Sequence, residues 1–261
     1  MMKRARLSLL LLSLAAIAGA CSPQREATAR PAPLLDDDRA QAFEAARLLE
    51  RGEAEAAEPI LRALRRRYPG DIALALAHAE ALLELDRPSE ARAALAPFED
   101  RASGALTGRS SSALYVMRAR VVLHEGDRPR AEAILNEASA RHPESPAPLL
   151  MLLELEANKR ALRQAIAQSL PLLIAPPLRF FELSLRLAFD EGDAELIEAL
   201  AIRLVEAHPS RAQSVLDAFE ERLLDEPALY LRLVLAFKDE PEIVGRKLAA
   251  KEALRTRQRD R

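Results

Sequence analysis

The residues with the widest chemical range in this chain are four histidines and a single cysteine. His78, His124, His142 and His208 are scattered along the sequence, with no HxxxH or HExxH pair and no cysteine beside them, so their spacing does not indicate a metal site. There is no GxSxG segment, no glycine-rich phosphate loop and no aromatic platform for bases. The sequence therefore predicts a protein with no catalytic residues, no metal ligands and no cofactor.

Two of the histidines occupy equivalent local positions. His142 and His208 each precede a proline, as Tyr68 does, and the three short segments around them are alike. Proline lacks an amide hydrogen and disfavours helical angles in the residue before it, so each segment marks the end of a helix. We expect these three side chains to pack or to form hydrogen bonds at a helix end.

The composition is that of a soluble helical protein. Charged residues make up 30% of the 261 residues and hydrophobic residues 49%, with 8 glycines and no tryptophan. The 38 basic and 40 acidic residues give a formal net charge of −2. Because phosphate binding needs a net basic face, this balance argues against nucleic acid as the main partner.

The first twenty residues predict an export signal. Basic residues precede an apolar run over residues 7–17, which is too short to span a bilayer as a permanent helix. Ala18-Gly19-Ala20-Cys21 resembles the lipobox of bacterial lipoproteins, which implies cleavage before Cys21 and its acylation. The alternative is an ordinary signal peptide with an incidental cysteine. Ser22, rather than aspartate, follows Cys21, so the resemblance favours the inner leaflet of the outer membrane, facing the periplasm.

The segment after the cysteine predicts a flexible tether. Residues 21–35 contain three prolines and no helical period, whereas three aspartates follow directly at residues 36–38. The aspartates could suggest a metal site, but negative charge is also stabilising at the start of a helix. We interpret them as the start of the first helix. Because Cys21 is the only cysteine, no disulfide can form within the chain.

Residues 112–145 predict two helices joined by a tight turn. Gly126 can adopt positive φ, so the first helix can end there, and Pro143 ends the second. Ala119 and Ala131 are small where two helices must approach closely. The length of 34 residues and these landmarks resemble a tetratricopeptide repeat. The resemblance implies an all-α fold, a right-handed TPR-like α-solenoid of stacked helix pairs.

The same frame recurs along the chain and predicts about six helix pairs. They cover residues 38–71, 72–98, 112–145, 146–177, 178–211 and 212–238. The turn between the two helices of each of the first five pairs is expected at Gly52, Asp86, Gly126, Arg160 and Gly192.

Two segments depart from this frame. Residues 99–111 interrupt the array with two glycines and a serine run, as a tolerated insertion or as a loop that touches a partner, and Ser112 is expected to cap the next helix. Residues 239–261 predict a basic helix that caps the open end of the array. The alternative for this helix is contact with an acidic partner or with anionic lipid head groups.

The resemblance also implies which residues line the concave face of the array. They form apolar rows and one row of charges that alternate in sign, and the set expected to bind a partner is Leu76, Glu80, Val116, Arg120, Leu150, Glu154, Arg186, Phe189 and Glu220. In one interpretation the charges of adjacent helices pair with each other and the leucines serve packing. In the other, the face is a cleft for an amphipathic helix or extended segment of another protein.

Together these features predict a lipid-anchored periplasmic scaffold for protein–protein interactions in envelope assembly. By resemblance, one possible role is that of a pilotin, a lipoprotein that helps secretin subunits of a pilus machine to assemble. The alternatives are a component of outer-membrane β-barrel assembly and a regulator that recruits a peptidoglycan enzyme. The expected partners are an envelope protein and, through the anchor, the membrane, with no nucleic acid and no small-molecule substrate.

Overall fold

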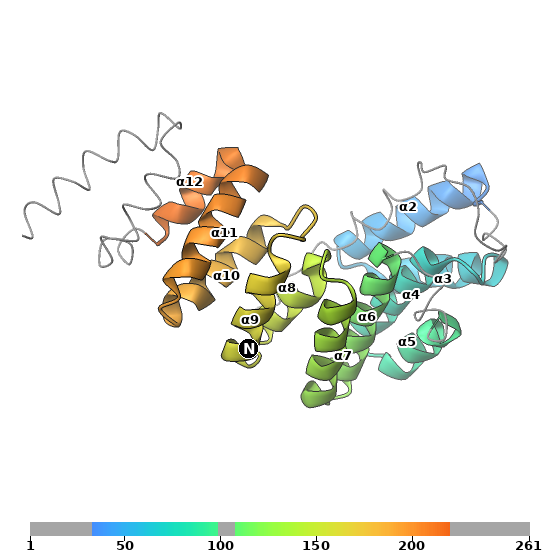
Figure 1. Cartoon of the computed structure of the whole chain (residues 1–261). Coiled ribbons are helices and arrows are strands. Elements are labelled where there is room, and N and C mark those ends of the chain that lie inside the picture. Colours follow the sequence, from blue (N-terminus) through green and yellow to red (C-terminus); the bar gives the residue numbers. More distant parts are fainter. Residues whose placement is uncertain (1–32, 99–107, 220–261) are drawn as a thin grey trace, which may run out of the picture. The chain divides into compact units, whose positions relative to one another are not determined.

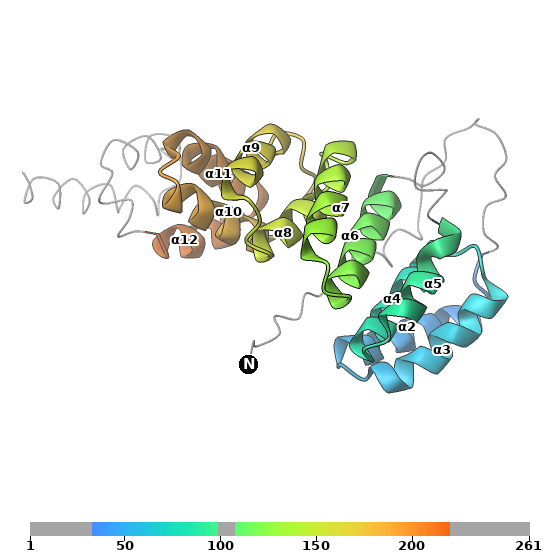
Figure 2. The same cartoon turned by 90° about the horizontal axis from the view of Figure 1, so that it is seen from below.

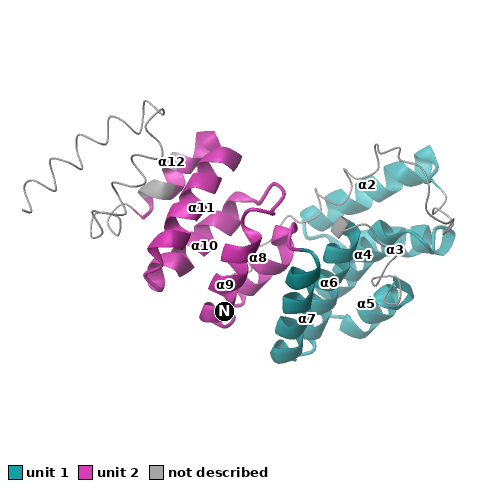
Figure 3. Ribbon diagram, in the orientation of Figure 1, with its two compact units in different colours: residues 1–142 teal, residues 143–261 magenta. Residues whose placement is uncertain are grey.

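The computed structural model describes residues 33–98 and 108–219, and within these ranges the chain forms helices and turns with no strand. The predicted all-α class is therefore confirmed. The chain divides into two compact units, residues 1–142 and 143–261 (Figure 3). Several predictions lie outside the described residues: the signal at 1–20, Cys21 and the tether as far as residue 32, the segment 99–107, Glu220, and the capping helix at 239–261. None of the described helices is both long enough and apolar enough to cross a membrane.

In its described residues, 33–98 and 108–142, the first unit contains three helix pairs. Its helices are α2 (Asp36–Glu50), α3 (Ala54–Arg67), α4 (Ile72–Glu84), α5 (Pro88–Leu95), the short 3-10 helix η2 (Ala96–Phe98), α6 (Gly108–His124) and α7 (Arg128–Arg141). From α2 to α7, each α-helix packs on the next α-helix along the chain (Figures 1 and 2). In addition, α4 packs on both α2 and α6. Buried side chains, mostly alanine and leucine, cluster between the described helices of this unit, and one cluster includes Phe98.

The second unit repeats this arrangement. As far as residue 219 its helices are α8 (Pro146–Glu154), α9 (Lys159–Ser169), α10 (Leu178–Asp190), α11 (Ala194–Ala207) and α12 (Pro209–Asp217). Each helix packs on its neighbour in sequence, and α8 also packs on α10. The largest side chains without exposed surface here are Phe180 and Phe181, whose ring centroids lie 5.6 Å apart in an edge-to-face contact.

The helices of each of the first five pairs are joined by the same turn. One residue adopts positive φ, and the N–H of the next residue donates to the carbonyl five positions earlier at 2.8–3.1 Å, which is the Schellman motif that ends many helices. The positive-φ residues are Gly52 (77°), Asp86 (57°), Gly126 (85°), Glu156 (48°) and Gly192 (66°). Four of these turns lie where the sequence frame placed them.

The turn of the fourth pair corrects the sequence prediction. It lies at Glu156 instead of Arg160, which is part of α9. The first helix of this pair has only nine residues, because α9 already begins at Lys159, where the Asn158 side chain accepts the Ala161 N–H at 3.1 Å. The side-chain cap at Asn158 therefore sets the start of α9.

A second correction concerns the start of α6. This helix begins at Gly108, four residues before the cap expected at Ser112. Ser111 and Ser112 are both buried within the helix, and the Ser111 hydroxyl lies 2.9 Å from His142 Nε2. The serine run therefore lies inside α6 instead of capping it, and Ser111 bonds to His142 within the unit.

Replacing Gly126 tests the shared turn. Because alanine in the left-handed region is strained, Gly126→Ala should lower the free energy of unfolding by about 1 kcal/mol, although no atom lies within 4 Å of the added Cβ. Asp86→Gly should do the opposite and stabilise by about 0.5 kcal/mol. Urea unfolding of the two variants measures both changes, and equal effects of the same sign would contradict the shared conformation.

Candidate functional site

Four of the expected concave-face residues lie in the first unit, on α4 and α6. Leu76 and Val116 are buried and contribute to packing. Glu80 and Arg120 form an ion pair in which Arg120 Nη2 donates to Glu80 Oε1 at 2.7 Å and Nη1 contacts the other carboxylate oxygen. The charged row was open to two interpretations, and for Glu80 and Arg120 the one that applies is pairing between adjacent helices.

Four further members of the expected set lie in the second unit. Leu150 is buried in α8, and Glu154 is exposed at the end of that helix. On α10, Arg186 is exposed and Phe189 is half-buried. The Phe189 ring stacks on Phe219 with a centroid separation of 5.0 Å, so this side chain also has a packing partner within the chain.

A buried polar cluster between α3 and α4 was missed by the sequence interpretation. Glu58 is 5% exposed, and Arg62 Nε and Nη2 donate to its two carboxylate oxygens at 2.9 and 2.8 Å. His78 Nε2 lies 3.0 Å from Glu58 Oε1, and Arg65 Nη1 lies 3.2 Å from His78 Nδ1. Because arginine can only donate, Nδ1 must accept and Nε2–H must donate to Glu58, so His78 is neutral.

The surroundings shift the pKa values of both titratable groups downward. Burial alone would raise the pKa of Glu58, but hydrogen bonds from His78 and Arg62 outweigh it and hold that pKa below its ordinary value. Burial lowers the pKa of His78, and Arg65 lowers it further, whereas the hydrogen bond to Glu58 acts in the opposite direction. The cluster is therefore most stable with Glu58 ionised and His78 neutral.

We expect His78 to make the protein less stable in weak acid. Since the pKa of His78 is lower in the folded state, the unfolded chain binds a proton first, and stability falls as the pH drops below the ordinary value of 6.5. Glu58 acts in the same direction at lower pH. Urea midpoints measured between pH 7 and pH 5 should fall less steeply for His78→Gln than for the natural protein, and parallel slopes would contradict the lowered pKa of His78.

A sequence signal for this cluster exists. Glu58 falls on the buried side of α3, between Ala57 and Leu61, where a carboxylate needs a partner. All the hydrogen-bonding groups named above face one another, so the cluster joins α3 to α4 and does not present a reactive group to a substrate. We interpret it as structural.

The residues before the closing prolines play the role that the sequence predicted. Tyr68, His142 and His208 each end the second helix of a pair; Tyr68 and His142 also bond the first turn of the first helix of the same pair, and His208 bonds the segment just before that helix. Tyr68 donates to Asp38 Oδ2 at 2.7 Å, His142 Nε2 lies 2.9 Å from Ser111 Oγ, and His208 Nε2 lies 2.8 Å from the Pro176 carbonyl. These bonds hold the two helices of a pair together at the end opposite the turn.

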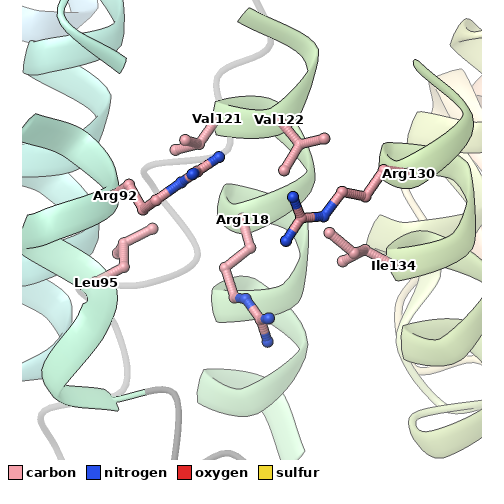
Figure 4. Close-up of a pocket in the computed structure, with 7 residues that line it drawn as sticks. All are labelled: Arg92, Leu95, Arg118, Val121, Val122, Arg130 and Ile134. Atoms are coloured by element: carbon pink, nitrogen blue, oxygen red, sulfur yellow. The ribbon is translucent and has the colours of Figure 1, made fainter. Parts of the chain in front are cut away.

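One surface of the described part of the chain with ligand-binding chemistry is a pocket between α5, α6 and α7, which we call the arginine pocket. It has a volume of about 130 Å³ and is lined by Arg92, Leu95, Arg118, Val121, Val122, Arg130 and Ile134. Figure 4 shows Arg92 and Arg130 extending from α5 and α7 on either side toward α6, which carries Arg118 and the two valines. Cationic groups therefore lie around an aliphatic wall.

The periodicity of the helices could not reveal this pocket, because its residues come from two consecutive pairs and from faces that the concave-face frame leaves out. The only available signal was the excess of arginine on these helices. Guanidinium groups suit carboxylates and phosphates, and the aliphatic wall suits an apolar side chain. No group of three or more histidine, cysteine or carboxylate side chains in the described ranges could hold a metal ion.

Comparisons of the chain with models of protein families, with curated proteins and with solved structures found no match.

Proposed function

We propose that this protein is a lipid-anchored scaffold that binds other proteins at the periplasmic face of the outer membrane, through a right-handed TPR-like α-solenoid. The observation that supports this proposal best is the recurrence of one helix pair with one turn. Positive-φ residues at the same place in five pairs, and packing of alternate helices in each unit, are typical of repeat proteins. Such proteins bind partners on extended surfaces.

Within this class, a pilotin-like role for a secretin or pilus machine is our first candidate, since the sequence frame gives about six pairs behind a lipobox-like segment. Membership of the β-barrel assembly machinery and recruitment of a peptidoglycan enzyme are the alternatives. In cells that lack the protein, heat-resistant secretin multimers should decrease, while β-barrel proteins should keep their normal level. Unchanged secretin multimers would contradict the pilotin role.

The anchor has its own test. Metabolic labelling with palmitate should label the natural protein, and Cys21→Ser should abolish the label and release the protein from outer-membrane fractions. A labelled Cys21→Ser variant, or an unlabelled natural protein, would contradict lipidation at this residue. Because Cys21 is the only cysteine, the result cannot be confused by another thiol.

The scaffold function is tested by affinity purification of the full chain from detergent-solubilised envelopes. We expect the same envelope proteins to be enriched in independent experiments, and charge reversal at Arg186, which is exposed, to leave the fold unchanged. If that variant loses a partner, the predicted concave face takes part in binding. If it keeps all partners, the interface lies elsewhere, and the arginine pocket is the next candidate.

A further inference from the structure

We propose that the arginine pocket binds an acidic segment of a partner protein, with its carboxylates on the guanidinium groups and one aliphatic side chain against the apolar wall. This inference rests on the proposed scaffold function and names the chemistry of the partner. Four observations lead to it: the charges of the pocket, the state of Arg130, the aliphatic wall and the size.

The charges of the pocket favour an anionic ligand. Each of three helices contributes one arginine, and none of the seven lining residues is acidic. Arg92 pairs with Glu125 at the edge of the pocket, and the guanidinium carbon of Arg118 lies 5.7 Å from the centroid of the Tyr115 ring. Arg92 and Arg118 thus have partners within the chain, and the positive charge that an incoming carboxylate can use lies on Arg130.

Arg130 is the arginine most available to a ligand. It is exposed on α7 and forms no ion pair with any residue in the described part of the chain. Its backbone N–H is taken by Asp127, whose side chain caps α7 at 3.1 Å, so the helix that carries it is held in place. A guanidinium on a fixed helix, without a carboxylate of its own, is well placed for two parallel bonds to a carboxylate of another protein.

The wall and the size decide between kinds of anion. Leu95, Val121 and Val122 are buried and Ile134 is half-buried, so the wall is aliphatic and Ile134 offers its exposed part to an apolar group of a ligand. Pockets for cofactors and drug-sized ligands measure roughly 300–1,000 Å³, whereas this one measures about 130 Å³, which suits a single side chain. Inorganic phosphate would use only the arginines, while an acidic peptide uses both parts.

The probe is a fluorescein-labelled peptide, Glu-Glu-Leu-Glu-Glu, titrated with the full chain in detergent and followed by fluorescence anisotropy. Two control peptides carry glutamine in place of every glutamate, or serine in place of the leucine. We expect Arg130→Ala to weaken binding about tenfold, since truncated interface arginines commonly cost that much. Arg66→Ala is the matched control, because Arg66 is exposed on α3 and also lacks an ion pair with a described residue.

A second variant separates the apolar contact from the charges. Ile134→Ser should weaken the leucine peptide but leave the serine peptide unchanged, and added salt should weaken the leucine peptide in every variant. The proposal is overturned if no anisotropy change occurs at protein concentrations up to about 1 mM, if the glutamine peptide binds equally well, or if Arg66→Ala weakens binding as much as Arg130→Ala. Binding of phosphatidylglycerol vesicles through Arg130, without peptide binding, would also overturn it and assign the pocket to lipid.

If peptides fail to bind while Arg130→Ala still co-purifies its envelope partners, the scaffold function stands and only the pocket assignment fails.

Discussion

Glu58→Ala should lower the free energy of unfolding by about 3 kcal/mol, because it leaves buried donors without an acceptor. His78 Nε2–H and Arg62 both bond this carboxylate, and His78 has no other acceptor in the cluster. The Arg62 side chain is 46% exposed and can turn toward water, which keeps the loss at the lower end of the range for buried ion pairs. Urea unfolding at pH 7 measures the change.

The control for this variant is Glu90→Ala. Glu90 also pairs with an arginine, Arg87, but its side chain is 57% exposed, so we expect its unfolding midpoint to stay close to that of the natural protein. Equal losses in the two variants would show that burial of Glu58 does not matter. The structural interpretation of the cluster would then be wrong.

Phe181→Ala should cost about 4 kcal/mol, the range found when a buried phenylalanine is truncated. Phe181 has no exposed surface, and its ring makes edge-to-face contacts with Phe180 at 5.6 Å and with His208 at 5.8 Å. The variant therefore loses a fully buried side chain of the second unit and the ring contact with His208, which ends α11. Denaturant unfolding gives the size of the loss, and hydrogen exchange should locate it in α10 and α11.

The same substitution at an exposed phenylalanine provides the comparison. Phe43 is 47% exposed on α2, so Phe43→Ala should change stability by less than about 1 kcal/mol. If the two variants lost similar amounts, the packing assigned to the second unit would be contradicted.

Much of the fold follows from local sequence. The glycines at 52, 126 and 192 predict their turns because only the left-handed region allows the chain to reverse there, and all three have positive φ. The fourth turn could not be placed in this way, because Glu156 is not a glycine and the position depends on the side-chain cap at Asn158. The repeat length of the neighbouring pairs placed this turn at Arg160, four residues after its actual position at Glu156.

The features that could not be predicted from the sequence depend on contacts between residues that are far apart in the chain. The bonding role of His142 at a helix end was predicted, but its partner Ser111 lies 31 positions earlier and depends on how α6 meets α7. The pairing of Glu80 with Arg120 was one of two open interpretations, since helical spacing does not say whether adjacent charges meet each other or a partner. The arginine pocket was missed for the same reason, because three separate helices form it.

The claim that this protein is a scaffold is tested most directly by photocrosslinking in living cells, with Ile134 replaced by p-benzoylphenylalanine. Ile134 is half-buried in the wall of the arginine pocket, so its replacement places the reactive group beside Arg130. We predict a discrete adduct with one envelope protein, reduced when Arg130 is also changed to alanine and missing when the reactive group is at position 66. Absence of any specific adduct from position 134, and equally from positions 120 and 186 on the predicted concave face, would contradict the scaffold function.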